Sequence, residues 1–145
     1  MRIEIKKVKE TAVLPTRGSE RAAGYDLYSC RSESVTVKPH TTVKIGTGVA
    51  MAIPNGYFGA IYARSGIAAK KGLRPANAVG VIDSDYRGEI IVALHNDTNE
   101  PQTIEPWERI AQLVVMPFLP VEFEEVNSLD ETQRGKGGFG STGTV

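Results

Sequence analysis

The chain has 145 residues, enough for one domain with a substantial hydrophobic core. Hydrophobic residues make up 41% and charged residues 23%, and the formal net charge is zero, which argues against a protein held on nucleic acid or on a membrane surface by bulk charge. Cys30 is the single cysteine, which excludes an internal disulfide bond and favours a reducing cytoplasm.

Apolar residues recur with a period close to two along most of the chain, which predicts short β-strands. The first run lies in the charged segment "MRIEIKKVKE", which is typical of a strand and not of a signal peptide. Further runs follow at 35–37, 43–45, 49–53 and 90–94, and none is long enough to cross a membrane. Turn residues separate the runs, so we expect an all-β, single-domain fold, either a distorted β-barrel or a jelly-roll-like sandwich.

Two of these runs carry more specific expectations. The Asn55-Gly56 pair separates "VAMAI" from "YFGAIYA" and predicts a hairpin, because both residues accept a positive φ. In the run at 90–94, Ile91 and Ala93 are apolar as well as the residues that alternate with them. We therefore expect that strand to be buried on both faces.

The segment "RSGIAAKKGLRP" breaks the alternation and predicts one short helix. Ser65 is the expected N-cap and Gly72 the expected stop, with Pro75 beyond it. Arg64, the Ser65 hydroxyl and the free N–H groups of the helix start would together suit an anion. An ordinary capped helix without a ligand is the alternative interpretation.

The segment "NAVGVIDSDYRGEI", residues 77 to 90, holds a run of polar residues after apolar ones. If it is extended, Asp83 and Asp85 point to one side and Ser84 and Tyr86 to the other. A carboxylate at a strand end can act as a general base or hold metal-bound water. Gly80 would let another group approach the backbone closely. A plain hairpin turn rich in Asp and Ser is the alternative.

Two further polar residues stand among apolar ones. Asp26 lies between Tyr25 and Leu27 in "AAGYDLYS" and is either a turn cap or a site residue. Gln112, in "ERIAQLVVMP", needs hydrogen-bond partners if it is buried. The two histidines of the chain lie far apart in the sequence, so a zinc site or a Ser-His-Asp triad is poorly supported.

The C-terminal part changes character after about residue 120. We expect a last strand near 121–125, an acidic connector and then a Gly-rich arm, which divides the chain into a β-domain at 1–126 and a flexible segment at 127–145. Residues 135–140 match G-x-G-x-x-G, but no helix or acidic residue follows as a dinucleotide fold requires. The arm is therefore either an unstructured tail or a segment that orders over an anionic ligand.

Taken together, these clusters resemble, in order and in wording, the five motifs of the trimeric deoxyuridine triphosphatase (dUTPase) family. The matching segments are "AGYDLYS", "ARSGIA", "GVIDSDYRGE", "ERIAQL" and "RGKGGFGSTG". The resemblance covers about residues 1 to 143. Two departures concern loop geometry: Ala63 stands where the family commonly has proline, and "PWERIAQ" replaces the commoner Gly-Asp before the arginine of the fourth motif.

The resemblance implies an enzyme that hydrolyses dUTP to dUMP and pyrophosphate with Mg²⁺, which keeps uracil out of DNA and supplies dUMP for dTMP synthesis. It also implies a β-rich homotrimer with three active sites, each built from all three subunits. Asp83 would activate water for in-line attack on the α-phosphorus, and Tyr86 would lie beneath the deoxyribose. The backbone from Gly80 to Ile82 would pair with the uracil edge, and Asn77 would add a side-chain hydrogen bond.

The remaining motifs would hold the triphosphate. By resemblance, Asp26 would orient waters on the Mg²⁺ without ligating it, the metal being held mainly by the triphosphate. The implied phosphate-binding residues are Arg64, Ser65, Gly66 and Gln112. The arm would close over the site as a lid: Arg134 would reach the γ-phosphate and Phe139 would stack on uracil, with further substrate contacts from Gly140, Ser141 and Thr142.

Three alternatives stay open at this point. A dCTP deaminase resembles this family in fold, but we would expect a glutamate base in its third motif. A nucleotide-sensing module that binds without catalysis would be indicated by loss of the base or of the arm, and both are present. A single-strand nucleic-acid binder is disfavoured by the zero net charge and by the small number of aromatic residues.

Overall fold

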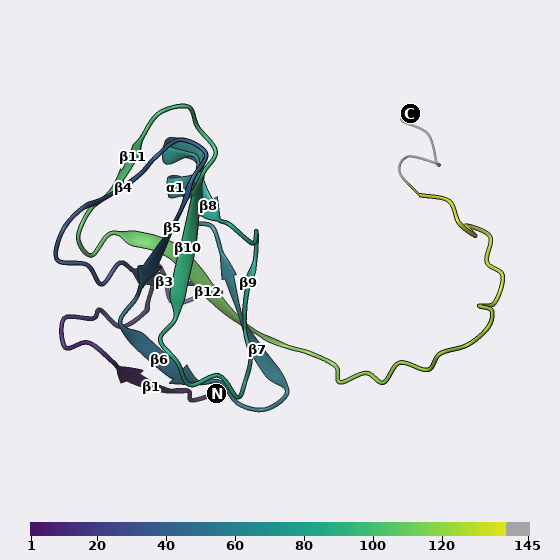
Figure 1. Cartoon of the computed structure of the whole chain (residues 1–145). Coiled ribbons are helices and arrows are strands. Elements are labelled where there is room, and N and C mark those ends of the chain that lie inside the picture. The colour runs from purple at the N-terminus through teal and green to yellow at the C-terminus, as the bar shows by residue number, and fades with distance from the viewer. Residues whose placement is uncertain (139–145) are drawn as a thin grey trace.

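The computed structural model describes residues 1–138 and is built almost entirely of β-strands (Figure 1). The elements in chain order are β1 (Glu4–Lys7), β2 (Thr16–Arg17), β3 (Tyr25–Tyr28), β4 (Val35–Val37), β5 (Thr42–Gly46), β6 (Val49–Ala52), β7 (Tyr57–Tyr62), α1 (Ser65–Lys71), β8 (Leu73–Pro75), β9 (Gly80–Ile82), β10 (Ile91–Asn96), β11 (Gln102–Ile104) and β12 (Arg109–Pro117). The predicted all-β fold with one short helix is confirmed. In the described part of the chain, no helix has the length and apolar character needed to span a membrane.

The strands of the described chain form several sheets, in which the paired strands run antiparallel. The largest sheet has the order β2-β3-β12-β7-β9, and a second sheet has the order β5-β10-β8. Two smaller pairs, β1 with β6 and β4 with β11, complete the fold. Because consecutive strands often belong to different sheets, residues far apart in the sequence meet at the strand ends.

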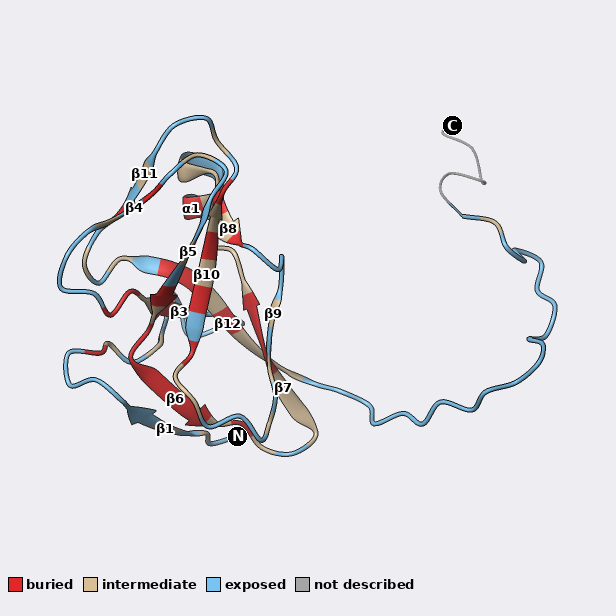
Figure 2. Cartoon of the chain, in the orientation of Figure 1, coloured by how far each residue is buried: buried red, intermediate tan, exposed pale blue. Residues whose placement is uncertain are grey.

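The core lies between these sheets (Figure 2): buried residues alternate along β10, whereas β6 and β7 each bury three residues in a row. Leu27, Ile45, Leu94 and Ile110 are each at most 1% exposed, one from each of four strands. Burying such a side chain contributes about 1.5–3 kcal/mol, so burial of the apolar side chains of the strands is the main source of stability. The helix adds Ile67, its one buried residue.

The turn at Asn55-Gly56 forms as expected, but it does not make a hairpin. Gly56 has a φ of 82°, and the Asn55 side chain accepts its N–H at 3.0 Å. However, β6 pairs with β1, whereas β7 pairs with β12 and β9. The hairpin prediction is therefore wrong: the turn carries the chain from one sheet to another.

The predicted C-terminal end of the helix is confirmed, and the predicted N-terminal end is wrong by one residue. Gly72 is the C-cap, with a φ of 60°, and its N–H bonds the carbonyl of Ala68, as expected for a left-handed cap. Ser65 is not the N-cap but the first helical residue, and Arg64 stands in the cap position without a side-chain capping bond. The Arg64 backbone still has the extended conformation of the preceding strand, which moves the helix start by one residue.

Two predictions about strands fail in the single chain. On β10, Val92 and Leu94 are buried, but Ile91 is 51% exposed, because only one face of the β5-β10-β8 sheet packs on the core. The strand expected at 121–125 is absent: regular structure in the described residues ends at Pro117, and Phe123 is 95% exposed. Figure 1 shows this segment leaving the β-domain and running away from it.

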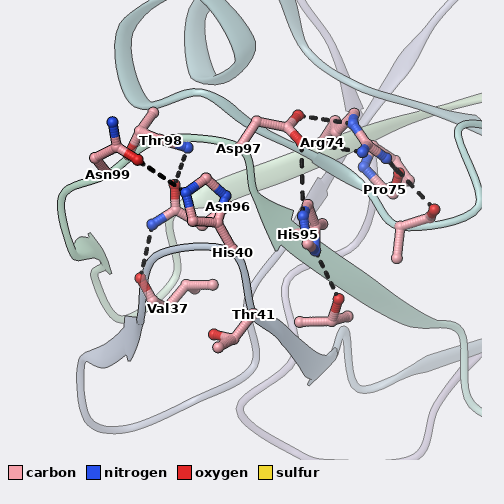
Figure 3. Close-up of polar contacts among 12 residues, drawn as sticks. Val37, His40, Thr41, Arg74, Pro75, His95, Asn96, Asp97, Thr98 and Asn99 are labelled. Atoms are coloured by element: carbon pink, nitrogen blue, oxygen red, sulfur yellow. Dashed lines mark hydrogen bonds and ion pairs between the residues drawn. The ribbon is translucent and has the colours of Figure 1, made fainter.

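A polar corner at the end of β10 ties several loops together (Figure 3). Asn96 is fully buried; its amide donates to the carbonyls of Val37 and Glu100, and its oxygen accepts from the N–H and hydroxyl of Thr98. Every polar group of this side chain therefore has a partner, as burial requires.

Folding also brings the two histidines to this corner, although they lie far apart in the sequence. The His40 ring bonds the Asn99 side chain at 2.9 Å, and the His95 ring bonds the Thr42 hydroxyl at 3.0 Å. Within residues 1–138 no group of three His, Cys, Asp or Glu side chains is arranged to hold a metal ion. The corner is a structural network, separate from the motif residues.

Candidate active site

The carboxylate of Asp26 accepts hydrogen bonds from two arginines that lie far away in the sequence. Arg64 Nε donates to one carboxylate oxygen at 2.6 Å, and Arg109 Nη1 donates to the other at 3.2 Å. The Asp26 side chain is 13% exposed, so it is nearly buried, whereas the Arg109 side chain is 51% exposed. One negative charge faces two positive ones, and this cluster therefore has a net positive charge suited to an anionic ligand.

Strand pairing explains why these residues meet. Gln112 on β12 lies opposite Asp26 on β3 and opposite Tyr62 on β7. Its amide donates to the carbonyl of Ala63 at 2.8 Å, which supplies a partner for this polar residue in an apolar run. Gly24 leaves room for this side chain, because a Cβ at Gly24 would collide with the Gln112 side-chain oxygen and displace it. The first, second and fourth motifs thus form one cluster, with Ser65 and Gly66 exposed next to it.

The turn before Arg109 is held by an ion pair with the helix. Lys71, the last residue of α1, donates to the Glu108 carboxylate and to the Thr103 carbonyl, both at 2.6 Å. Trp107 occupies the position where the resembling family commonly has glycine, and its φ is 55°, in the left-handed region that glycine prefers. The chain keeps the turn despite this departure, and the indole N–H bonds the Thr11 carbonyl at 3.3 Å.

The third motif forms a separate cluster between β9 and β10. A shallow cavity of about 160 Å³ is lined by Val81, Ile82, Asp83, Tyr86, Glu89 and Ile91. Of the two conformations considered for residues 83–86, the chain adopts the turn and not the extended one: the Tyr86 N–H bonds the Asp83 carbonyl at 3.1 Å and closes a turn over the two residues between them. The Asp83 side chain is exposed at the start of this turn.

The chain before β9 shapes the other edge of this cluster. Ala78 has a φ of 61°, which is uncommon for a residue other than glycine, and its N–H bonds the Pro75 carbonyl. This turn sets Asn77 beside Gly80, so that a Cβ at Gly80 would lie 3.7 Å from the Asn77 amide nitrogen. The same Cβ would lie 3.0 Å from Cβ of Ile61, so Gly80 lets β9 approach β7 closely.

The two clusters lie at opposite ends of β7 within one chain. Ile82 pairs with Gly59, so Asp83 follows at the beginning of β7, whereas Arg64 follows the end of that strand. At about 3.3 Å per residue, six residues of strand separate them by about 20 Å. A carboxylate and an arginine that far apart cannot contact the same phosphate group from a single chain.

Sequence reasoning named most of these residues but missed three contacts. Arg109 lies in the segment "ERIAQL", but the sequence alone assigned it no role. Only the register of β3 against β12 shows that its side chain reaches Asp26. Gly24 and Gly88 were also missed, because a glycine that leaves space for a distant side chain carries no local signal. On the arm, the Arg134 side chain bonds the Gly137 carbonyl at 2.9 Å. Phe139, Gly140, Ser141 and Thr142 lie outside the described residues.

Comparison with known proteins identifies the family of this chain. The model of the dUTPase family matches residues 10–143. The chain belongs to the dUTPase family. It is 46% identical over 143 residues to the deoxyuridine 5'-triphosphate nucleotidohydrolase of Hydrogenobaculum sp. (strain Y04AAS1) and 48% identical over 143 residues to that of Nautilia profundicola, with 99% of each chain covered in both cases.

Solved dUTPase structures share the fold. The Staphylococcus bacteriophage 80alpha dUTPase with dUPNHPP superposes with a TM-score of 0.88 at 30% identity, covering 99% of both chains. A mutant dUTPase from phage phi11 of S. aureus, whose structure reveals the coordination of a structural Mg(II) ion, gives a TM-score of 0.77 at 27% identity, covering 88% of this chain and 98% of that one. The predicted family and the all-β fold class are therefore confirmed.

Proposed function

We propose that this protein hydrolyses dUTP to dUMP and pyrophosphate, and so keeps uracil out of DNA and supplies dUMP for dTMP synthesis. The observation that carries the proposal is the Asp26–Arg64–Arg109 cluster with Gln112, assembled from three motifs in the dUTPase order. The relatives named as deoxyuridine 5'-triphosphate nucleotidohydrolases, alike over nearly their whole length, support the same substrate.

In this proposal Asp83 is the general base. Its exposed carboxylate takes a proton from water, the water oxygen forms a bond to the α-phosphorus, and the bond from that phosphorus to the bridging oxygen breaks. Pyrophosphate leaves in line with the attacking water. The chemistry needs positioning and charge neutralisation more than a covalent nucleophile, which suits a cluster of arginines and backbone groups.

The phosphates are held, in our proposal, by Arg64, Ser65, Gly66 and Gln112. Asp26 keeps the Arg64 guanidinium in place through the 2.6 Å contact, and Arg109 provides the second counter-charge to that carboxylate. Ser65 and Gly66 are exposed at the start of α1, where backbone N–H groups have no helical acceptor. An anion reaching this surface meets donors that are already oriented.

The deoxyuridine is read, in our proposal, by the third motif. The backbone from Gly80 to Ile82 pairs with the uracil edge, with Asn77 beside it, and the Tyr86 ring lies under the sugar and leaves no room for a 2′-hydroxyl. The cavity between β9 and β10 supports this role, because its lining combines an aromatic ring, apolar side chains and the Asp83 carboxylate.

Mg²⁺ is the cofactor that the family implies, and the described residues fit it only as an ion brought by the substrate. Mg²⁺ keeps several waters and binds through one or two carboxylates together with substrate phosphates. Asp26 is a single carboxylate that two arginines already engage, so it fits as a group that orients metal-bound waters and not as a ligand. When bound, the ion would neutralise charge on the triphosphate.

We further propose a homotrimer in which each site takes residues from different subunits. The distance of about 20 Å between Asp83 and Arg64 along β7 supports a shared site. Apolar side chains on the segment after β12, including Phe123 and Leu119, are exposed in the single chain. An apolar groove of about 520 Å³, lined in part by Ile3 and Val115, offers a surface that such a segment of another subunit could cover. The number three comes from the family resemblance.

The arm completes the proposed site. Arg134 would neutralise charge on the γ-phosphate, Phe139 would stack on uracil, and Gly140, Ser141 and Thr142 would add contacts to the substrate. The extended segment from 118 to 138 supports a reach toward a neighbouring subunit (Figure 1). The division into a β-domain at 1–126 and an arm at 127–145 remains part of this proposal, and the lone cysteine fits a cytoplasmic enzyme.

The deciding experiment compares four nucleotides. The purified protein is incubated with Mg²⁺ and either dUTP, dCTP, dTTP or UTP, and both pyrophosphate and ammonia are measured. Release of pyrophosphate from dUTP alone supports the proposal. Ammonia from dCTP would assign a deaminase instead, and binding of dUTP without any product would assign a nucleotide-sensing module.

A further inference from the structure

The Tyr86 ring lies directly against the backbone of Gly88. A Cβ at position 88 would collide with the Tyr86 hydroxyl oxygen and would stand 2.6 Å from Cζ and 3.0 Å from Cε2 of the ring. Gly88 is not among the described glycines with a positive φ, so a left-handed backbone conformation is not the reason for a glycine here. The glycine is therefore present to leave space for the tyrosine ring, not to make a turn.

A second contact fixes the other end of the ring. The Tyr86 hydroxyl donates to the Glu89 carbonyl at 3.0 Å. Glu89 is itself anchored, because its carboxylate accepts the N–H of Gly48 at 2.8 Å, in the turn between β5 and β6. The next residue, Ile90, exchanges bonds with the same region: its N–H donates to the Val49 carbonyl, and its carbonyl accepts from Thr47.

We propose that Gly88 determines the specificity for deoxyribose by setting the position of the Tyr86 ring. This inference rests on the proposed function, in which that ring excludes a 2′-hydroxyl by crowding. The ring can exclude one small group by crowding only if the position of the ring is fixed to within a fraction of an ångström. Gly88 leaves the space in which the ring lies, and the fixed Glu89 carbonyl holds the hydroxyl at its tip, so the ring has one position.

The expected effect follows from the size of the clash. With alanine at position 88 the ring must leave its place, because the backbone beneath it belongs to an anchored segment and the tyrosine is the part that can move. The bond to the Glu89 carbonyl is then lost, and the ring turns toward solvent, to which Tyr86 is already 43% exposed. Discrimination of one small group in a pocket is worth about 10–200-fold, so we expect Gly88→Ala to raise the UTP to dUTP ratio of kcat/KM by about tenfold or more.

The experiment measures kcat/KM for dUTP and UTP in the wild type, Gly88→Ala, Tyr86→Ala and the double variant. Because the alanine acts only through the ring, it should raise the ratio in the wild-type background and leave it unchanged in the Tyr86→Ala background. Gly18→Ala is the matched control, since a Cβ there meets nothing within 4 Å and Gly18 lies outside the proposed site.

Each outcome separates this inference from the function on which it rests. If the wild type does not hydrolyse dUTP in preference to UTP, the proposed function fails. If Tyr86→Ala raises the ratio but Gly88→Ala lowers turnover of both nucleotides equally, the inference is overturned and the function stands. If Gly88→Ala does not fold, Tyr86→Phe decides: removal of the hydroxyl that bonds the Glu89 carbonyl must raise the ratio, and an unchanged ratio overturns the inference.

Discussion

Replacement of Asp26 by asparagine tests whether this carboxylate holds Arg64, which we propose to bind phosphate, in place. The substitution keeps the shape of the side chain and one acceptor oxygen but removes the charge between Arg64 and Arg109. The contact to Arg64 is short, 2.6 Å, and both side chains are at most 25% exposed. A hydrogen bond between charged groups of this kind contributes about 1.5–3 kcal/mol.

The contact to Arg109 adds much less. Its distance is 3.2 Å and its arginine is 51% exposed, so solvent screens the pair and its contribution is about 0–1 kcal/mol. We therefore expect Asp26→Asn to lower the free energy of unfolding by about 2–3 kcal/mol. Turnover of dUTP should fall by a larger factor than stability alone explains, because Arg64 loses its orientation.

The assay is urea denaturation of the wild type and the variants at one fixed protein concentration, since assembly makes the apparent stability depend on concentration. Double-mutant cycles of Asp26→Asn with Arg64→Gln and with Arg109→Gln give the two coupling energies separately. The reasoning predicts a larger coupling with Arg64. A coupling with Arg109 as large as that with Arg64, or a loss of stability below about 0.5 kcal/mol, the range of ordinary surface substitutions, would refute it.

Four other outcomes are expected. Asp83→Asn should lower single-turnover hydrolysis of dUTP by about 10²–10⁴-fold while equilibrium binding persists, because only the base is lost; hydrolysis at the wild-type rate would remove Asp83 from this role. Truncation after Gln133 should leave the thermal unfolding midpoint unchanged yet strongly slow turnover, and Arg134→Ala should reproduce most of that defect, since in our proposal Arg134 neutralises charge on the leaving pyrophosphate and the loss of one such donor costs about 10²–10³ in rate. Trp107, the single tryptophan, should change its emission when a nonhydrolysable dUTP analogue binds with Mg²⁺, because its turn leads to Arg109 in the Asp26–Arg64–Arg109 cluster, the phosphate site of our proposal; constant emission at saturation would argue against movement of that turn. Phe123→Glu should shift sedimentation from trimer to monomer and reduce activity in parallel; an unchanged trimer would show that this ring is not covered by assembly.

The sequence was sufficient for features that depend on local chemistry. Alternation of apolar residues located most strands, and Gly72 marked the end of the helix because a left-handed residue is needed there. The cluster of Asp26, Arg64 and Gln112 was named from motifs, and the antiparallel register of β3, β12 and β7 brings these residues together.

Features that depend on distant partners could not be predicted. Asn55-Gly56 makes the expected turn, but whether its flanking strands pair with each other is decided by β1 and β12, which compete for them. Trp107 and Ala78 adopt left-handed backbone conformations that neither residue type favours, because surrounding hydrogen bonds hold them there. The reach of Arg109 to Asp26 follows from strand register, which no single segment of sequence contains.

The exposure of Ile91 and the missing strand at 121–125 have one physical explanation. Ile91 was expected to be buried and residues 121–125 were expected to form a strand, since apolar side chains recur in both with the period of a β-strand, yet Ile91 is 51% and Phe123 95% exposed in the single chain. A hydrophobic sequence pattern indicates that side chains are buried, but it does not distinguish burial within the chain from burial against another copy of the same chain. Exposed apolar side chains on a strand face and on an outgoing segment are therefore what a subunit of a shared-site oligomer would display before assembly. Our proposed function favours a shared site for a separate reason: the proposed base Asp83 and the proposed phosphate-binding residue Arg64 lie about 20 Å apart along β7 of one chain, too far to act on the same phosphate group.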